Sequence, residues 1–191
     1  MPRLTHCAHD FLAPLLTPGA IAIDLTAGNG YDTLFLAQHV SPSGRVYSFD
    51  IQPEALAATK ARLEAHFAIA SPEHVELICA NHAELARHVP SGAQGEVSAV
   101  IANLGYLPGG SRALITTPES TILAIRISAD YVRPGGGISI LCYRGHPGGA
   151  EEADEVVGFF RNLDSAIWEV GGVGEEGDCH KPVWVWGRRR M

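Results

Sequence analysis

Short apolar runs alternate along this chain with longer segments in which apolar residues recur at helical spacing. The apolar runs predict strands over about 20–25, 45–50, 75–79, 97–102 and 138–143. The other segments predict helices over about 6–16, 31–40, 53–67, 82–89, 118–132 and 151–163. Two last apolar runs, at about 166–170 and 182–186, predict an antiparallel hairpin. This alternation indicates an α/β fold, with a seven-stranded, mostly parallel sheet between two layers of helices.

The 191 residues predict a single domain of the Rossmann-like type. We expect an N-terminal helix within 1–18, a cofactor-binding core in 19–149, and a C-terminal helix and hairpin in 150–191. The proline and glycines of 133–137 are expected to end a helix before strand five begins. The chain lacks an apolar run of the ~18 residues that a membrane span needs, and its N-terminus has no apolar signal core. We therefore expect a cytoplasmic protein with no membrane partner.

The formal net charge of −7 disfavours a nucleic-acid partner, but the charges are unevenly distributed. Nine acids and one base lie between 150 and 180, which leaves 12 acids and 13 bases in the rest of the chain. We interpret the acidic excess as a solvated helix face and the loop after it. The basic cluster at 188–190 is either a solvated tail or a phosphate contact. The charge distribution therefore leaves RNA open as a partner.

The four cysteines are scattered and form no Cys-x-x-Cys pair. Cys79 and Cys142 fall in strand patterns and are expected to be small core residues. Two groups of cysteine and histidine lie close together in the sequence, namely His6, Cys7 and His9, and then Cys179 and His180. Surface and core roles suit these residues better than metal ligation, and we expect no metal.

The most informative segment joins the first strand to the next helix. An apolar run ends in Asp24, and a turn containing Gly28 and Gly30 leads into a helical pattern. A strand, a glycine turn and a helix N-terminus bring backbone N–H groups close to a small ligand. The second strand ends in Asp50, whose carboxylate can accept two hydrogen bonds from a ribose diol. The sequence therefore predicts a site for a nucleoside cofactor.

The residues after the glycine turn indicate which nucleoside is bound. A dinucleotide fingerprint has a third glycine, but here Tyr31, Asp32 and Thr33 follow Gly30. Asp32 would repel a pyrophosphate, yet it can accept a hydrogen bond from a ligand amine. S-adenosylmethionine fits, with its adenosine at Asp50 and its charged amino-acid end at the acids near the glycine turn, Asp24 and Asp32. An NAD-dependent oxidoreductase and a non-catalytic module of the same fold remain as alternatives.

Other strand ends also carry polar residues. Asn81 can bond an adenine edge, and His82 either stacks on that base or faces solvent. Asn103 and Tyr106 occupy a glycine-rich connection that partly matches the Asn-Pro-Pro-Tyr motif of amino methyltransferases, in which the Asn accepts hydrogen bonds from the target nitrogen. His146, after strand five, is a candidate base or substrate ligand.

Several blocks of the sequence resemble the rRNA methylase family of small class I methyltransferases, a family associated with methylation of 5-aminomethyl-2-thiouridine in tRNA. The resemblance spans about residues 8–165 and is carried by these blocks: Ala8-His9, Gly28-Asn29-Gly30-x-Asp32-Thr33, Phe49-Asp50-Ile51-Gln52, Asn103-Leu104-Gly105-Tyr106-Leu107-Pro108-Gly109-Gly110, Thr116-Thr117-Pro118-Glu119 and Gly145-His146-Pro147-Gly148-Gly149 with Glu151 and Glu152.

The resemblance implies S-adenosylmethionine as methyl donor, the wobble uridine of a tRNA anticodon stem-loop as target, and a homodimer. Carried onto this chain, the implied cofactor contacts are Asn29, Asp32, Asp50, Gln52 and His82, and the implied substrate residues are Asn103, Tyr106 and His146. The C-terminal segment departs from the family, because an Asn-rich hairpin with two prolines is reduced here to Pro182. Ribosomal RNA and a small-molecule amine therefore remain alternative substrates.

Overall fold

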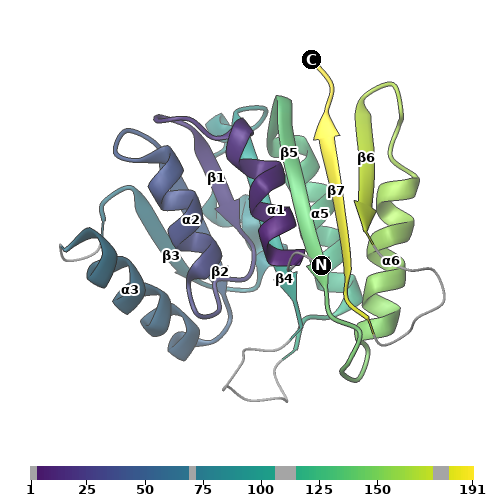
Figure 1. The fold of residues 1–191 in the computed structure, drawn as a ribbon, viewed down its shortest axis with the longest axis horizontal. Helices are drawn as coiled ribbons and strands as arrows, with labels where there is room; N and C mark the ends of the chain where they lie inside the picture. The colour runs from purple at the N-terminus through teal and green to yellow at the C-terminus, as the bar shows by residue number, and fades with distance from the viewer. Residues whose placement is uncertain (1–3, 69–71, 106–114, 174–180) are drawn as a thin grey trace.

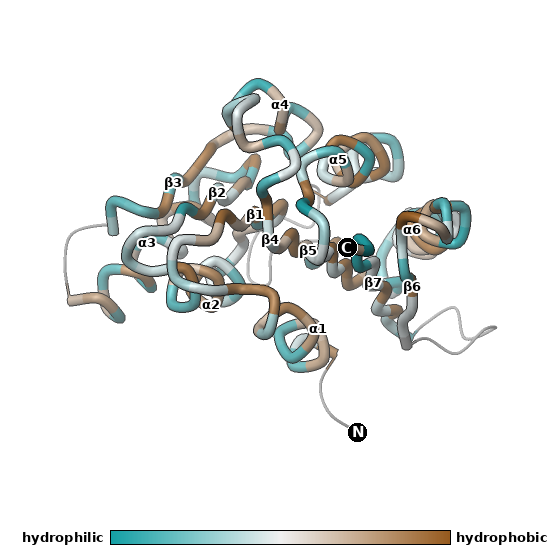
Figure 2. Tube along the Cα trace, turned by 90° about the horizontal axis from the view of Figure 1, so that it is seen from above, coloured by the Kyte–Doolittle hydropathy of each residue, from teal (hydrophilic) through white to brown (hydrophobic). Residues whose placement is uncertain are grey.

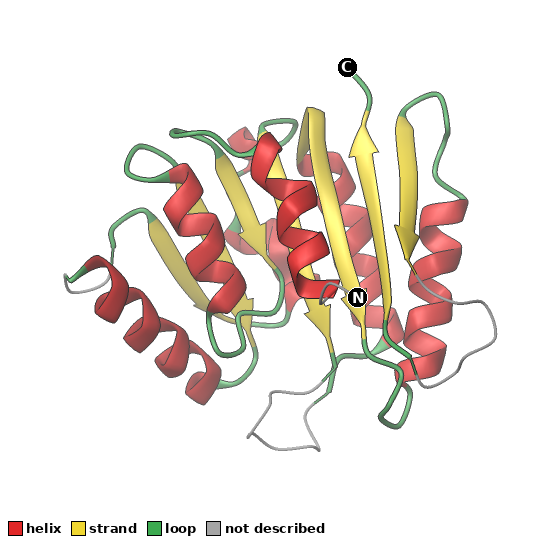
Figure 3. Ribbon diagram, viewed as in Figure 1, coloured by secondary structure: helices red, strands yellow, loops and turns green. Residues whose placement is uncertain are grey.

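The computed structural model describes residues 4–68, 72–105, 115–173 and 181–191, and contains one sheet of seven strands (Figure 3). The strands are β1 (Ile21–Asp24), β2 (Arg45–Asp50), β3 (Val75–Cys79), β4 (Val97–Leu104), β5 (Val132–Cys142), β6 (Trp168–Val173) and β7 (Val183–Arg189). Their order across the sheet is β3-β2-β1-β4-β5-β7-β6. The first five are parallel, and β7 runs antiparallel to both of its neighbours. The mostly parallel sheet and its terminal hairpin are thus confirmed.

Helices cover both faces of the sheet. One face carries α1 (Leu4–Leu12), α2 (Tyr31–Val40) and α3 (Pro53–Phe67), and the other carries α4 (Leu85–His88), α5 (Pro118–Tyr131) and α6 (Gly149–Arg161) (Figure 2). Short 3₁₀ turns occur at Ala13–Leu15, His82–Glu84 and Ser91–Ala93. No helix in the described ranges is long and apolar enough to cross a membrane.

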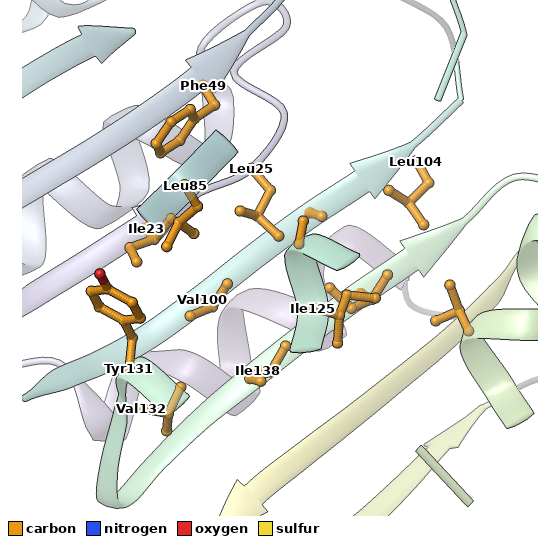
Figure 4. Packing of buried hydrophobic residues seen from close by; sticks show 14 of the residues in the cluster. Ile23, Leu25, Phe49, Leu85, Val100, Leu104, Ile125, Tyr131, Val132 and Ile138 are labelled. Carbon is orange, nitrogen blue, oxygen red and sulfur yellow. The ribbon is translucent and has the colours of Figure 1, made fainter. Parts of the chain in front are cut away.

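Strand residues alternate between two cores because successive side chains of a strand point to opposite faces. Ile23 and Phe49 pack into the cluster beneath α4, α5 and α6, together with Leu85, Ile125 and Tyr131 (Figure 4). Strand residues that face the other way join Leu12, Leu36 and Leu63 of the helices α1 to α3 in the second cluster; examples are Ala22, Val46 and Ile101. The doubly covered sheet places all five parallel strand ends at one edge, which is the lower edge in Figure 1.

The predicted element boundaries agree with the observed ones at several helices and strands, some of which are flanked by proline or glycine. The predicted ranges 31–40, 45–50, 53–67 and 75–79 match α2, β2, α3 and β3. The N-terminal helix is shorter than predicted, because Pro14 lacks the N–H that an α-helix would bond, and the helix continues as a 3₁₀ turn.

Strand β5 begins six residues earlier than predicted. The segment 133–137 does not end the helix ahead of a later strand, because Val132 already pairs with Val97 and the chain then bulges before Gly137 pairs with Ala99. A Cβ at position 137 would lie 2.9 Å from Leu15 Cδ1 and 3.0 Å from the Phe11 ring, so glycine lets these two side chains pack directly on the strand. The glycines therefore allow the N-terminal segment to pack closely on the sheet.

The expectation for the two strand cysteines was half right. Cys142 is buried in the core, but Cys79 is exposed. The reason is that β3 is an edge strand, so the end of it is covered on fewer sides than the pattern of apolar residues suggests.

Candidate active site

A large open cavity lies at the carboxyl ends of the parallel strands. It has a volume of about 1310 Å³ and is lined by the ends of β1, β2, β4 and β5 and by Thr5, His6 and His9 of helix α1. A typical site for one small ligand occupies about 300–1,000 Å³. The cavity is therefore large enough for a nucleoside cofactor and part of a second ligand.

Asp50 lines this cavity and is held by two backbone N–H groups. Its Oδ2 accepts a hydrogen bond from the Gly28 N–H at 3.0 Å, and its Oδ1 accepts one from the Gln52 N–H at 2.9 Å. Each carboxylate oxygen can accept a second bond, and Asp50 lines the cavity with Gly28, Asn29 and Gln52. This arrangement suits a ribose diol, as the sequence predicts.

Asp24 lies beneath the glycine turn and does not line the cavity. Its side chain is fully buried and accepts bonds from Thr33 Oγ1 at 2.6 Å and from the Thr26 N–H at 3.0 Å. Burial, and then the negative charge of Asp32, raise the pKa of Asp24 to about 7. The prediction that Asp24 contacts the cofactor is therefore wrong, because the residue instead fixes the strand end and the start of α2.

Gly30 also lies outside the cavity lining. It precedes α2 with a φ of 78°, and a Cβ at this position would lie 2.7 Å from the Thr59 Cα in α3. Glycine at this position therefore allows the turn to approach α3 closely.

Asp32 links two different elements at the far side of the glycine turn. Its Oδ1 is 2.6 Å from His9 Nε2 in α1, and its Oδ2 accepts a hydrogen bond from Asn103 Nδ2 at the end of β4. The backbone N–H of Asn103 donates to Thr26 Oγ1 at 2.8 Å. Asp32, Asn103 and His9 all line the cavity. The sequence predicted roles for Asp32 and Asn103, but it gave none to His9, although the Ala8-His9 block was a signal.

Asn81 and His82 both line the cavity. Asn81 Oδ1 caps the following turn by accepting the Ala83 N–H at 2.9 Å. His82 is 8% exposed, so the solvent-facing alternative is wrong. Burial lowers the pKa of His82, and its neutral ring donates from Nδ1 to the Leu25 carbonyl at 3.2 Å. Its buried Nε2 has no hydrogen-bond partner among the described residues, which leaves an acceptor for a ligand.

His146 and Tyr143, which follow β5, also line the cavity, while Tyr106 lies outside the described residues. A Cβ on Gly149 would lie 2.7 Å from His146 Nε2, so glycine at this position allows the ring its place. Tyr143 was not predicted. Burial, followed by the charge of Asp32, raises its pKa, so it offers a neutral phenol beside the strand end.

A buried acid in α6 bonds two threonines close to the end of β4. Glu152 in α6 is 1% exposed and accepts the hydroxyl protons of Thr116 and Thr121, each at 2.6 Å. Thr116 Oγ1 in turn accepts the Gly105 N–H at 3.0 Å. Glu152 therefore does not belong to the solvated acidic face that the sequence predicted, because it ties α5, α6 and the end of β4 together.

The residues present fit S-adenosylmethionine. Asp50 provides ribose acceptors, His82 offers an open ring nitrogen, and Asp32 places a carboxylate in the same cavity. Within the described ranges, no three or more His, Cys, Asp and Glu side chains form a group that could hold a metal ion.

The family model described as "Putative rRNA methylase" matches residues 46–183. A "putative rRNA-methylase" structure from Clostridium thermocellum has 32% identity and a TM-score of 0.89, covering 99% of this chain and 98% of that one. A "putative methyltransferase" from Streptococcus mutans in complex with SAH has 33% identity and a TM-score of 0.84, covering 99% of each chain.

A curated relative from Arabidopsis thaliana is described as "tRNA (mnm(5)s(2)U34)-methyltransferase, chloroplastic". It is 36% identical over 171 residues, which are 87% of this chain and 62% of the relative. The chain thus spans less than two thirds of that relative. The family match, the structural likeness and the cofactor cavity agree: this chain belongs to the "Putative rRNA methylase" family of S-adenosylmethionine-dependent methyltransferases.

Proposed function

We propose that this methyltransferase acts on the wobble uridine of tRNA. The substrate would be 5-aminomethyl-2-thiouridine and the product 5-methylaminomethyl-2-thiouridine. The observation that carries the proposal is the 36% identity to the Arabidopsis relative whose description names that modification at U34. The proposal includes the anticodon stem-loop as the bound part of tRNA, and a cytoplasmic homodimer.

Bound S-adenosylmethionine supplies a methyl group on a sulfonium, which an amine attacks without needing a strong acid. The protein must hold that amine neutral and in line with the methyl, about 3–3.5 Å away. Asn103 suits this task, because its Nδ2 is engaged by Asp32 and its Oδ1 can accept an N–H of the amine. A neutral Tyr143 ring and His146 lie in the same part of the cavity, where a nucleobase would enter.

The net charge of −7 is the observation that favours a small-molecule amine instead. The acids that produce it are concentrated between 150 and 180, whereas the C-terminal end carries three arginines in sequence. The structure places these arginines at the edge of the sheet opposite the cavity, where Arg189 and Arg190 donate to the Val132 and Ser165 carbonyls, so the tRNA proposal does not rest on them (Figure 1).

The test is an acceptor comparison with labelled S-adenosylmethionine. Total tRNA from cells lacking the wobble methylation, ribosomal RNA, and a free 5-aminomethyluridine nucleoside would be offered at equal concentrations. Label incorporated only into tRNA supports the proposal. Label that enters ribosomal RNA or the free nucleoside equally well would contradict it, while the donor and enzyme class would stand.

A further inference from the structure

Of the three α1 residues that line the cavity, Thr5, His6 and His9, His9 contacts the carboxylate of Asp32. The ring of His9 stacks on Phe35 of α2, with a centroid distance of 3.9 Å and an interplanar angle of 3°. Its Nε2 lies 2.6 Å from Asp32 Oδ1, and the His9 side chain is 25% exposed while that of Asp32 is 10% exposed. The stack fixes the plane of the ring, and the short contact fixes which nitrogen faces the carboxylate.

The same carboxylate sets the direction of the Asn103 amide. Since an ionised carboxylate only accepts hydrogen bonds, the His9 Nε2–H and the Asn103 Nδ2 both donate to Asp32, one to each oxygen. With its backbone N–H also bound to Thr26 Oγ1, Asn103 is held at two points. An amide whose NH₂ group faces Asp32 offers its carbonyl oxygen to the cavity. Turned by half a rotation, it would offer donors, which repel the N–H bonds of an amine.

We propose that His9 is a positioning residue, which holds Asp32 so that Asn103 presents Oδ1, rather than Nδ2, to the amine that is methylated. A hydrogen-bond donor at position 9 is the required property, since Asp32 would otherwise be able to turn towards other donors in the cavity. The inference rests on the proposed function only for the identity of that amine, because the chain His9–Asp32–Asn103 exists without substrate.

The test compares His9→Leu with His9→Gln. Glutamine can donate an N–H to Asp32 from a similar distance, whereas leucine cannot. We expect His9→Leu to lower kcat at least about tenfold, with the KM for S-adenosylmethionine within about threefold of the parent, and expect His9→Gln to recover most of the loss. A purely structural role would not distinguish the two variants in this way. Equal kcat in all three proteins, or equal loss in both variants, would overturn the proposal.

His39→Leu is the matched control. His39 also packs on Phe35, at a centroid distance of 4.5 Å, and it lies on α2 without lining the cavity. Its replacement perturbs the same aromatic ring but leaves the Asp32 contact in place, so kcat should stay near that of the parent. A loss equal to that of His9→Leu would assign the effect to the aromatic stack and contradict the proposal.

A readout without substrate separates this inference from the proposed function. The side-chain ¹⁵N–¹H resonances of Asn103, assigned by their loss in Asn103→Ala, should move in His9→Leu and return towards their parent positions in His9→Gln. Unmoved resonances would refute the positioning role even if tRNA is methylated. If the resonances move as expected but tRNA is not methylated, the positioning holds and the proposed substrate is wrong.

Discussion

Replacement of Asp50 tests the cofactor site most sharply. Asp50→Ala removes a carboxylate that accepts the Gly28 and Gln52 N–H groups at 3.0 and 2.9 Å and that can accept two ribose hydroxyls. A hydrogen bond to a charged group contributes about 1.5–3 kcal/mol, so two lost ribose bonds cost about 3–6 kcal/mol. This corresponds to donor binding that is about 10²- to 10⁴-fold weaker.

The assay is calorimetric titration with S-adenosylmethionine, with circular dichroism to verify folding. Asp50→Asn should be nearly as weak, because its amide NH₂ would face one of the two backbone N–H groups. Glu54→Ala, an exposed acid in the first turn of α3, should bind as the parent does. Donor affinity in Asp50→Ala within about fivefold of the parent would refute the ribose assignment.

Three further variants test how the site is supported. Glu152→Ala leaves two threonine hydroxyls without their acceptor, so urea titration should find the free energy of unfolding lowered by about 2–4 kcal/mol. The exposed Glu151→Ala should show no comparable loss. Equal stability of the two variants would contradict the anchoring role of Glu152. Gly30→Ala places a Cβ 2.7 Å from the Thr59 Cα in a backbone with a φ of 78°. The melting temperature of this variant should fall by an amount equivalent to about 1–3 kcal/mol in the free energy of unfolding. An unchanged melting temperature would argue against the close approach. Because the folded protein raises the pKa of Asp24 from 3.8 to about 7, it holds this proton more tightly than the unfolded chain, so Asp24 lowers stability increasingly as pH rises from about 4 to about 7. Asp24→Asn should flatten that part of the stability–pH profile, and parallel profiles would be evidence against the shift.

The fold was largely predictable because local signals and the alternating pattern agree. Pro53 in the first turn of α3 and the glycines before α2 mark element boundaries that the structure reproduces. The boundary at β5 failed, since proline and glycine are typical of turns and their use in a bulge depends on pairing with β4. The exposure of Cys79 was likewise not predictable, because it depends on which elements cover the edge strand, and these lie far away in the sequence.

Strand ends predicted the candidate site only in part. Asp50 and Asn103 lie at strand ends and line the cavity. Asp24 also ends a strand, but it is buried beneath the glycine turn, where its carboxylate accepts bonds from Thr33 and the Thr26 N–H. No local pattern reveals that His9, 23 residues before Asp32, would reach its carboxylate. Glu152 was equally hidden, because its buried contacts are made with threonines more than 30 residues earlier in the sequence.

The most direct test of the central claim is nucleoside mass spectrometry of tRNA incubated with this protein and S-adenosylmethionine. The tRNA should come from cells that accumulate 5-aminomethyl-2-thiouridine. The account predicts that this nucleoside gains the mass of one methyl group and is replaced by 5-methylaminomethyl-2-thiouridine, with no gain for the Asn103→Ala variant. An unchanged wobble nucleoside, with the donor bound and the protein folded, would contradict the claim.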